Sequence, residues 1–142
     1  MASIRPQTVA EIAQRERNDV RAFDMSVREF LDSWQTMTPS ERTSALAEEP
    51  VCLSAVKDAY LAALAEHLAL SAGTTAPKWA DNSNRFLSEP FFAGGLESLK
   101  AILLVESPLS FRRRLIFISA DALSRPRRGF IEDNAIYATL DV

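Results

Sequence analysis

Residues 51–72, VCLSAVKDAYLAALAEHLALSA, form the longest helical pattern in this chain of 142 residues. One side of the pattern carries a row of apolar or amphipathic residues, namely Leu53, Val56, Tyr60, Leu64, His67 and Leu68. Their spacing places them on one face of an α-helix, and the many alanines favour helix and close packing. At 1.5 Å per residue this helix is about 30 Å long. We predict that it is the central helix of the core and that Gly73 is its C-cap.

The first 50 residues contain three candidate capping boxes, each a Ser or Thr followed three residues later by Glu. The pairs are Thr8 with Glu11, Ser26 with Glu29, and Thr38 with Glu41. In a capping box the two side chains and the first backbone amides of a helix satisfy one another. We therefore predict three short helices, of which the first ends near Asn18 and the third ends at Pro50.

The second of these helices has the clearest apolar face. Its residues Val27, Phe30, Leu31 and Trp34 stand at positions i, i+3, i+4 and i+7 and so form one stripe. A stripe of this kind has to be buried against another element. The third helix has Pro39 at its first helical position, where the missing amide costs nothing.

Residues 74–95 break the helical periodicity with several prolines, asparagines and glycines. The same segment carries five large apolar side chains, namely Trp79, Phe86, Leu87, Phe91 and Phe92. Burying an aromatic side chain stabilises a fold by about 2 kcal/mol. We therefore expect a long loop that wraps over the helical core and is held there by these residues.

The helical pattern resumes over residues 96–106. Ser107 and Pro108 then indicate a new helix start, which continues through Phe111 into a run of arginines. The following apolar run LIFI, residues 115–118, fits a buried short strand and an extended passage equally well.

Together these features predict a mainly α protein, built as a single compact helical bundle with a long aromatic-rich irregular loop and a short extended segment near the C-terminus. The length, with 47% hydrophobic and 25% charged residues, is typical of one globular domain with a genuine core. We expect one domain over residues 1–142. Within it, residues 1–50 hold the short N-terminal helices, residues 51–126 form the core module, and residues 127–142 are a tail that is either poorly ordered or docked on a partner.

The charge of the chain is unevenly distributed. Residues 111–128 hold six arginines and one acidic residue, so this segment is +5 while the rest of the chain is −8 and the total is −3. A basic patch on an acidic protein favours a specific acidic partner over general affinity for nucleic acid.

Arg112, Arg113 and Arg114 are consecutive, so on a helix their side chains point about 100° apart and cannot share one face. At least one of them should therefore reach inward or across the domain. Three interpretations fit the triplet: a solvated face, an interface anchor, or a buried ion pair, for instance with Glu106 or Asp121.

The sequence offers little for catalysis. Its single histidine, His67, and single cysteine, Cys52, are too few for an ordinary His/Cys metal site. His67 lies on the apolar face of the central helix and is interpreted as a core histidine, while Cys52 lacks a recognisable base that would form its thiolate. The glycine pair at residues 94–95 is not followed by a lysine in the manner of a phosphate-binding loop. We expect no enzyme, no cofactor and no metal.

A lone cysteine forms no internal disulfide. The N-terminal residues contain no apolar core of signal-peptide length, and the longest apolar run, residues 101–105, is far too short to span a bilayer. These features predict a cytoplasmic location.

An ordered set of short motifs over residues 56–126 resembles a known bacterial family. The motifs are LAALAEHLA at residues 61–69, Pro77 and Trp79, Arg85 to Leu87, Pro90 and Phe92, Leu99, Glu106 to Pro108, Phe111 to Arg114, Ile116 and Phe117, and Leu123 to Arg125. In this order they are similar to the C-terminal region of antitoxin-like regulators, which often follow a helix-turn-helix domain and are encoded beside nucleotidyltransferase-type toxins. In place of that DNA-binding domain, residues 1–50 show three short helices and no convincing helix-turn-helix pattern.

The resemblance implies a non-enzymatic protein-interaction module that binds and neutralises a partner toxin encoded nearby. Because arginines and large aromatic residues most often anchor interfaces, we expect the partner to contact Trp79, Arg85, Phe92, Arg112, Arg113, Arg114 and Arg125. The alternative is a transcriptional regulator that binds nucleic acid, since clustered arginines add salt-dependent affinity for phosphates.

Overall fold

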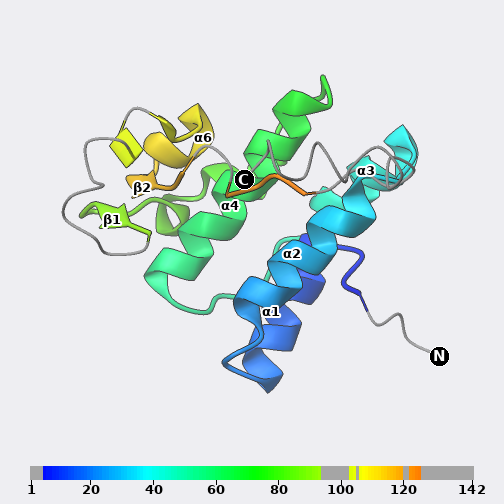
Figure 1. Cartoon of the computed structure of the whole chain (residues 1–142), viewed down its shortest axis with the longest axis horizontal. Helices are drawn as coiled ribbons and strands as arrows, with labels where there is room; N and C mark the ends of the chain where they lie inside the picture. Colours follow the sequence, from blue (N-terminus) through cyan, green and yellow to red (C-terminus); the bar gives the residue numbers. More distant parts are fainter. Residues whose placement is uncertain (1–4, 94–102, 105, 120–121, 126–142) are drawn as a thin grey trace, which may run out of the picture.

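The computed structural model describes residues 5–93, 103–104, 106–119 and 122–125. The protein is mainly helical and carries a small two-stranded parallel sheet near the C-terminal end, which confirms the predicted fold class (Figure 1). The elements are, in order, α1 (Val9–Asn18), α2 (Phe23–Trp34), α3 (Pro39–Ala47), α4 (Ala55–Ser71), the 3-10 turns η1 (Lys78–Asp81) and η2 (Ser83–Arg85), β1 (Phe91–Phe92), α6 (Leu109–Arg112) and β2 (Ile116–Phe117).

The central helix α4 lies between two groups of elements. On one side is the α1–α2 pair, and on the other are η1, η2, α6 and the β1–β2 sheet (Figure 1). One cluster of buried side chains runs through the molecule from Val9 in α1 to Ile118 after β2. The core is therefore shared by both groups, and α4 contributes to it from more than one face.

Two of the three predicted capping boxes are confirmed. The Thr8 hydroxyl accepts a hydrogen bond from the amide of Glu11 at 3.0 Å, and the Thr38 hydroxyl accepts one from the amide of Glu41 at 3.2 Å. In both, the Glu side chain bonds back to the cap residue's own amide. These helices begin where the sequence predicts because a capping box depends only on neighbouring residues.

The predicted start of α2 at Ser26 is wrong. The helix begins at Phe23, and Ser26 lies inside it with its amide bonded to the carbonyl of Ala22 at 2.8 Å. Phe23 is buried and packs edge-on against Tyr60, with ring centroids 5.7 Å apart. Burial of this ring extends the apolar face by one turn and outweighs the local capping signal at Ser26.

The central helix is shorter than predicted. It begins at Ala55 because Ser54 is its N-cap, so the first four residues of the predicted span lie outside the helix. At the other end Gly73 follows the C-cap Ala72 and takes a φ of 77°, a left-handed conformation that costs glycine little. The buried apolar side chains are Ala59, Leu61, Ala62, Ala63, Leu64, Ala65, Leu68 and Ala69. They extend well beyond the single predicted stripe because α4 has neighbours on both sides.

The loop after α4 wraps over that helix as predicted, through η1 and η2. Trp79 is buried, and Phe86, Leu87 and Phe92 are partly buried. Phe91 departs from the prediction because its side chain is 39% exposed.

Most of the helix predicted over residues 96–106 lies outside the described residues. Within that range, residues 103, 104 and 106 are described, and all three are helical. The next helix, α6, begins at Leu109, so Pro108 is its N-cap and Ser107 stands one residue before it. The Ser107 hydroxyl bonds to the backbone of Ile118 instead, accepting from its amide at 2.8 Å. The predicted tail, residues 127–142, also lies outside the described residues.

The LIFI run contains a genuine strand. Ile116 and Phe117 form β2, which pairs in parallel with β1 in the register Phe91 to Ile116 and Phe92 to Phe117. Both β2 residues are buried. Among the described residues, none of the helices has the length and apolar character needed to cross a bilayer.

Candidate functional site: an arginine-rich surface and its buried anchors

The structure divides the predicted partner-binding arginines into two groups. Arg85 and Arg114 are 0% exposed, whereas Arg112 and Arg113 are exposed and Arg125 is partly buried. The two buried guanidinium groups are engaged inside the protein. The contact of these residues with a partner stays a prediction.

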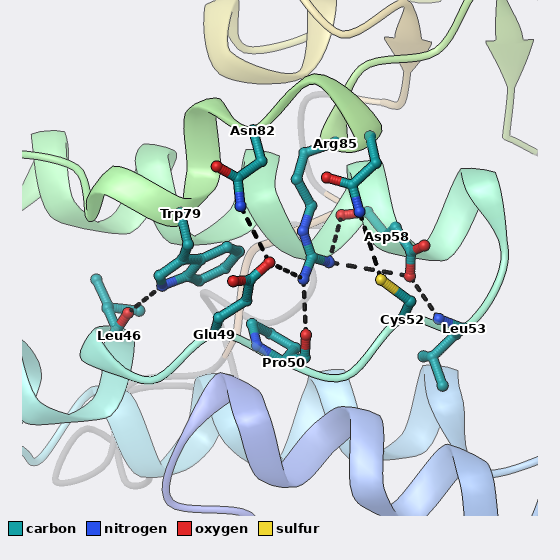
Figure 2. A network of polar contacts seen from close by, with 10 residues as sticks. Leu46, Glu49, Pro50, Cys52, Leu53, Asp58, Trp79, Asn82 and Arg85 are labelled. Atoms are coloured by element: carbon teal, nitrogen blue, oxygen red, sulfur yellow. Dashed lines mark hydrogen bonds and ion pairs between the residues drawn. The ribbon is translucent and has the colours of Figure 1, made fainter.

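Arg85, at the end of η2, reaches into the connection between α3 and α4 (Figure 2). Its Nη2 donates to the carbonyl of Pro50 at 2.7 Å and to Oε2 of Glu49 at 3.1 Å. Its Nη1 donates to the carbonyl of Asp58 at 3.3 Å and lies 3.9 Å from Oδ1 of the same residue. The guanidinium carbon lies 5.1 Å from the centre of the Trp79 ring. Carboxylates, carbonyls and an aromatic face together compensate this buried charge.

Three further side-chain hydrogen bonds join the same two segments (Figure 2). They run from Trp79 Nε1 to the Leu46 carbonyl at 2.9 Å, from Asn82 Nδ2 to Glu49 Oε2 at 3.1 Å, and from Asn84 Nδ2 to Cys52 Sγ at 3.4 Å. The loop after α4 is thus fastened to residues 46–53, the stretch through which the N-terminal helices join α4.

Arg114 is the second buried arginine. Its Nη1 donates to Oε1 of Glu66 at 2.5 Å and to the carbonyl of Ser110 at 2.8 Å, and its Nη2 donates to the carbonyl of Ala80 at 2.8 Å. Glu66 belongs to α4 and Ala80 to η1. One side chain therefore ties the end of α6 to both the central helix and the wrapping loop.

Arg113 shares the same carboxylate. Its Nη1 lies 2.6 Å from Oε2 of Glu66, and it stacks over the Phe86 ring at 5.2 Å while Arg114 stacks over that ring at 4.6 Å. Asp81 is a second, more distant acid, 3.7 Å from Arg113 and 3.9 Å from Arg114. The predicted inward turn of at least one arginine is confirmed, and its partner is Glu66. Of the partners named from the sequence, Asp121 lies outside the described residues.

The Glu66 carboxyl is held in its charged form. Burial raises its pKa, but hydrogen bonds and charge from Arg114 and Arg113 together outweigh burial, so the pKa lies below its ordinary value of 4.5. Its side chain is only 14% exposed. A carboxylate that is ionised and shielded makes the ion pair with Arg114 stronger than a surface pair.

Arg112 differs from its two neighbours. Its side chain forms no ion pair or hydrogen bond with the part of the chain that the structure describes. Leu109, three residues earlier on α6, is 67% exposed. Residues three apart lie on one face of a helix. An unpaired cation and a large apolar side chain thus stand next to each other at the surface, and we call Leu109 with Arg112 the α6 face.

The two remaining predicted residues, Arg125 and Phe92, have partners of their own within the fold. The Arg125 guanidinium bonds to both carboxylate oxygens of Asp32 in α2, at 2.9 and 3.3 Å, and its carbonyl accepts from Nε2 of Gln35 at 3.2 Å. Phe92 stacks on Phe117 across the sheet, with ring centroids 4.9 Å apart. Arg125 fastens residues after β2 to the N-terminal helices.

An aromatic cluster lies between α4 and α6. The Phe111 ring stands edge-on to Tyr60, with centroids 5.1 Å apart, and 6.3 Å from the ring of His67. Burial, followed by the charge of Asp24, raises the pKa of Tyr60 to about 12. Burial lowers the pKa of His67, which favours the neutral imidazole of a core histidine.

The described residues include no group of three or more His, Cys, Asp or Glu side chains that could hold a metal ion. Cys52 is exposed, and its thiol accepts a hydrogen bond from Asn84.

Sequence reasoning missed the acidic partners Glu49, Asp58 and Glu66. They lie 27 to 48 residues from their arginines, so no local spacing reveals the pairs.

Searches against protein-family models, curated proteins and solved structures find no match to this chain.

Proposed function

We propose that the protein is a non-enzymatic, antitoxin-like interaction module that binds and neutralises a partner toxin encoded nearby. The motifs over residues 56–126 suggest the class of partner. The observation that carries the proposal is the α6 face, where Leu109 is 67% exposed and Arg112 has no described partner.

In this proposal the buried arginines stabilise the fold and the α6 face binds the partner. Arg85 and Arg114 hold the loop and α6 in place, so removing either acts on the fold. The α6 face is free to meet another protein. Arginine combined with a large apolar side chain is typical of residues that dominate binding energy, and an unpaired guanidinium favours a partner that offers a carboxylate.

Co-expression with the product of the neighbouring gene, followed by pull-down and a growth assay, tests this function. We expect the wild-type protein to capture that product and to relieve its toxicity. The double variant Leu109→Ser/Arg112→Ser should keep the helical circular dichroism spectrum and lose most of the capture, because hot-spot residues each contribute about 2 kcal/mol or more to binding.

The matched control is Val20→Ser, which removes another highly exposed apolar side chain, in the connection between α1 and α2, on the opposite side of the molecule from α6 (Figure 1). It should bind like the wild type. Absence of binding by the wild-type protein contradicts the function, whereas equal loss in the control variant contradicts the placement of the interface on the α6 face.

A further inference from the structure

We propose that residues 107–118, here called the clasp, are a strained segment that the Arg114–Glu66 ion pair holds closed against α4, and that opens as a unit when this pair is lost. The strain is located at Leu115, the only described non-glycine residue with a positive φ, at 64°. In this left-handed conformation the side chain of an L-residue crowds its own backbone, so leucine rarely adopts it.

The left-handed turn makes the chain leave α6 in the direction of β2. The amide of Leu115 donates to the carbonyl of Arg112 at 2.9 Å, and its carbonyl accepts from the amide of Phe91 in β1 at 2.8 Å. Leu115 lies three residues after the last residue of α6. Glycine is the residue that most often takes a left-handed conformation near the end of a helix. Leucine here pays a conformational cost that the surrounding contacts have to offset.

Both sides of the turn are anchored. On the β2 side, the ladder continues with the Ala93 amide bonded to the carbonyl of Phe117 at 3.0 Å, and the Ile118 amide is bonded to Ser107. On the α6 side, Arg114 binds Glu66 and the carbonyl of Ala80. A strained conformation persists only where the surroundings fix it from several directions in this way.

Glu66 is the anchor whose loss opens the clasp. Its single carboxylate serves both Arg113 and Arg114, and Arg113 is 40% exposed, so this side of the cluster is in contact with solvent. Without that carboxylate the nearest described acid to the buried Arg114 is Asp81, at 3.9 Å. Nε of Arg114 already lacks a hydrogen-bond partner among the residues that the structure describes. A buried charge left without its counter-ion strongly disfavours the closed state.

The clasp contains α6 and therefore the α6 face. Its closure positions Leu109 and Arg112, and opening removes them from that position, so an acidic group that competes for Arg113 and Arg114 would switch the surface. This consequence rests on the function proposed above. The strain and the opening do not, and the following tests use the protein without any partner.

Melting temperatures of Leu115→Gly and Leu115→Ala measure the strain. Both variants lose nearly the same side-chain contacts and differ mainly in their tolerance of a positive φ. We expect the melting temperature of the Gly variant to lie a few degrees above that of the Ala variant. Relief of backbone strain at one residue shifts the melting temperature by about this amount in a chain of 142 residues. The control pair is Leu70→Gly and Leu70→Ala on the exposed side of α4, where the Gly variant should melt lower. An Ala variant at 115 that melts at or above its Gly counterpart overturns the strain.

Amide hydrogen exchange in Glu66→Gln measures the opening. We expect the amides of Phe91, Ala93 and Ile118, which bond to the clasp or belong to it, to exchange at least about tenfold faster, while the buried α4 amides of Leu61 and Leu64 keep their protection. Adding Leu115→Gly should slow the first group again.

Glu29→Gln is the matched control, since it removes a carboxylate that lies 2.9 Å from another arginine, Arg15. It should leave the clasp amides unchanged. Unaltered exchange of the clasp amides in Glu66→Gln, or an equal rise at Leu61 and Leu64, overturns opening of the clasp as a unit. Neither result depends on whether a toxin is bound.

Discussion

A fully buried arginine is stable only when its charge is compensated from several sides, and Arg85 meets this condition through contacts distant in sequence. Pro50, Glu49 and Asp58 supply the acceptors. The sequence singles out Arg85 only as part of the motif Arg85 to Leu87, from which we expect contact with a partner. The pattern does not reveal its burial, because the acceptors are two backbone carbonyls and carboxylates 27 to 36 residues away.

Replacing Arg85 by methionine should lower the free energy of unfolding by about 3 kcal/mol, measured by urea denaturation. Breaking a buried ion pair by removing one partner costs about 3–5 kcal/mol, and the lower value applies because Glu49 is partly exposed and regains water. Arg112→Met is the control, since Arg112 is exposed and has no ion pair with the described residues, and should change the free energy by less than about 0.5 kcal/mol. Equal effects of the two variants would contradict the anchoring role of Arg85.

Trp34 provides a second prediction at the scale of a residue. It is buried at the end of α2, its ring lies 6.1 Å from that of Phe30, and Arg42 stacks over it at 4.8 Å. Trp34→Ala should lower stability by about 3 kcal/mol through lost contacts and the remaining cavity. Trp34→Phe should recover part of this loss. An unchanged melting temperature for the Ala variant would show that the ring is not part of the core.

At the scale of elements, local signals predict local structure. The capping boxes at Thr8 and Thr38 and the glycine after α4 place helix ends to within a residue or two because each depends only on adjacent atoms. The start of α2 depends on Phe23 meeting Tyr60, 37 residues later, and was misplaced. The β1–β2 pairing likewise joins residues 25 apart, so the LIFI run alone could not be assigned.

The packing of α6 on α4 should weaken in mild acid through His67. Burial holds the pKa of His67 below its ordinary value of 6.5, so the unfolded chain binds the proton first as the pH falls. The contribution of the neutral imidazole to the free energy of unfolding is then fully present above pH 6.5 and decreases as the pH drops toward the folded-state pKa. Thermal melts between about pH 7.5 and 5 measure this slope. Glu66 has its own, lower window, because its pKa lies below 4.5.

His67→Gln is the variant that separates this effect from other acid-sensitive groups. It removes the titrating imidazole and keeps a polar side chain of similar size beside Phe111. The variant should show a flatter dependence of melting temperature on pH over the same range. An identical slope in both proteins would assign the acid sensitivity to another group.

At the scale of the whole molecule, the arrangement of charge differs from its distribution along the chain. The segment 111–128 is locally +5, yet Arg113, Arg114 and Arg125 each face a carboxylate from a segment far away in sequence. Those carboxylates belong to α2 and α4, which lie in the part of the chain outside residues 111–128 that carries a charge of −8. Half of the arginines in the basic segment thus join it to α2 and α4. Sums of charge along the sequence cannot show these ion pairs.

This pairing argues against nucleic acid as the partner. Each arginine already held by a carboxylate must break that bond before it can neutralise a phosphate, and the total charge of −3 repels the duplex. We expect no gel shift of a DNA duplex or an RNA hairpin at about 50 mM salt, where arginine–phosphate contacts are strongest. The matched comparison is Glu66→Gln, which frees Arg113 and should give at most weak retardation that salt abolishes. A shift by the wild-type protein that weakens steeply with salt would instead establish nucleic-acid binding and count against a purely protein-directed role for the arginines.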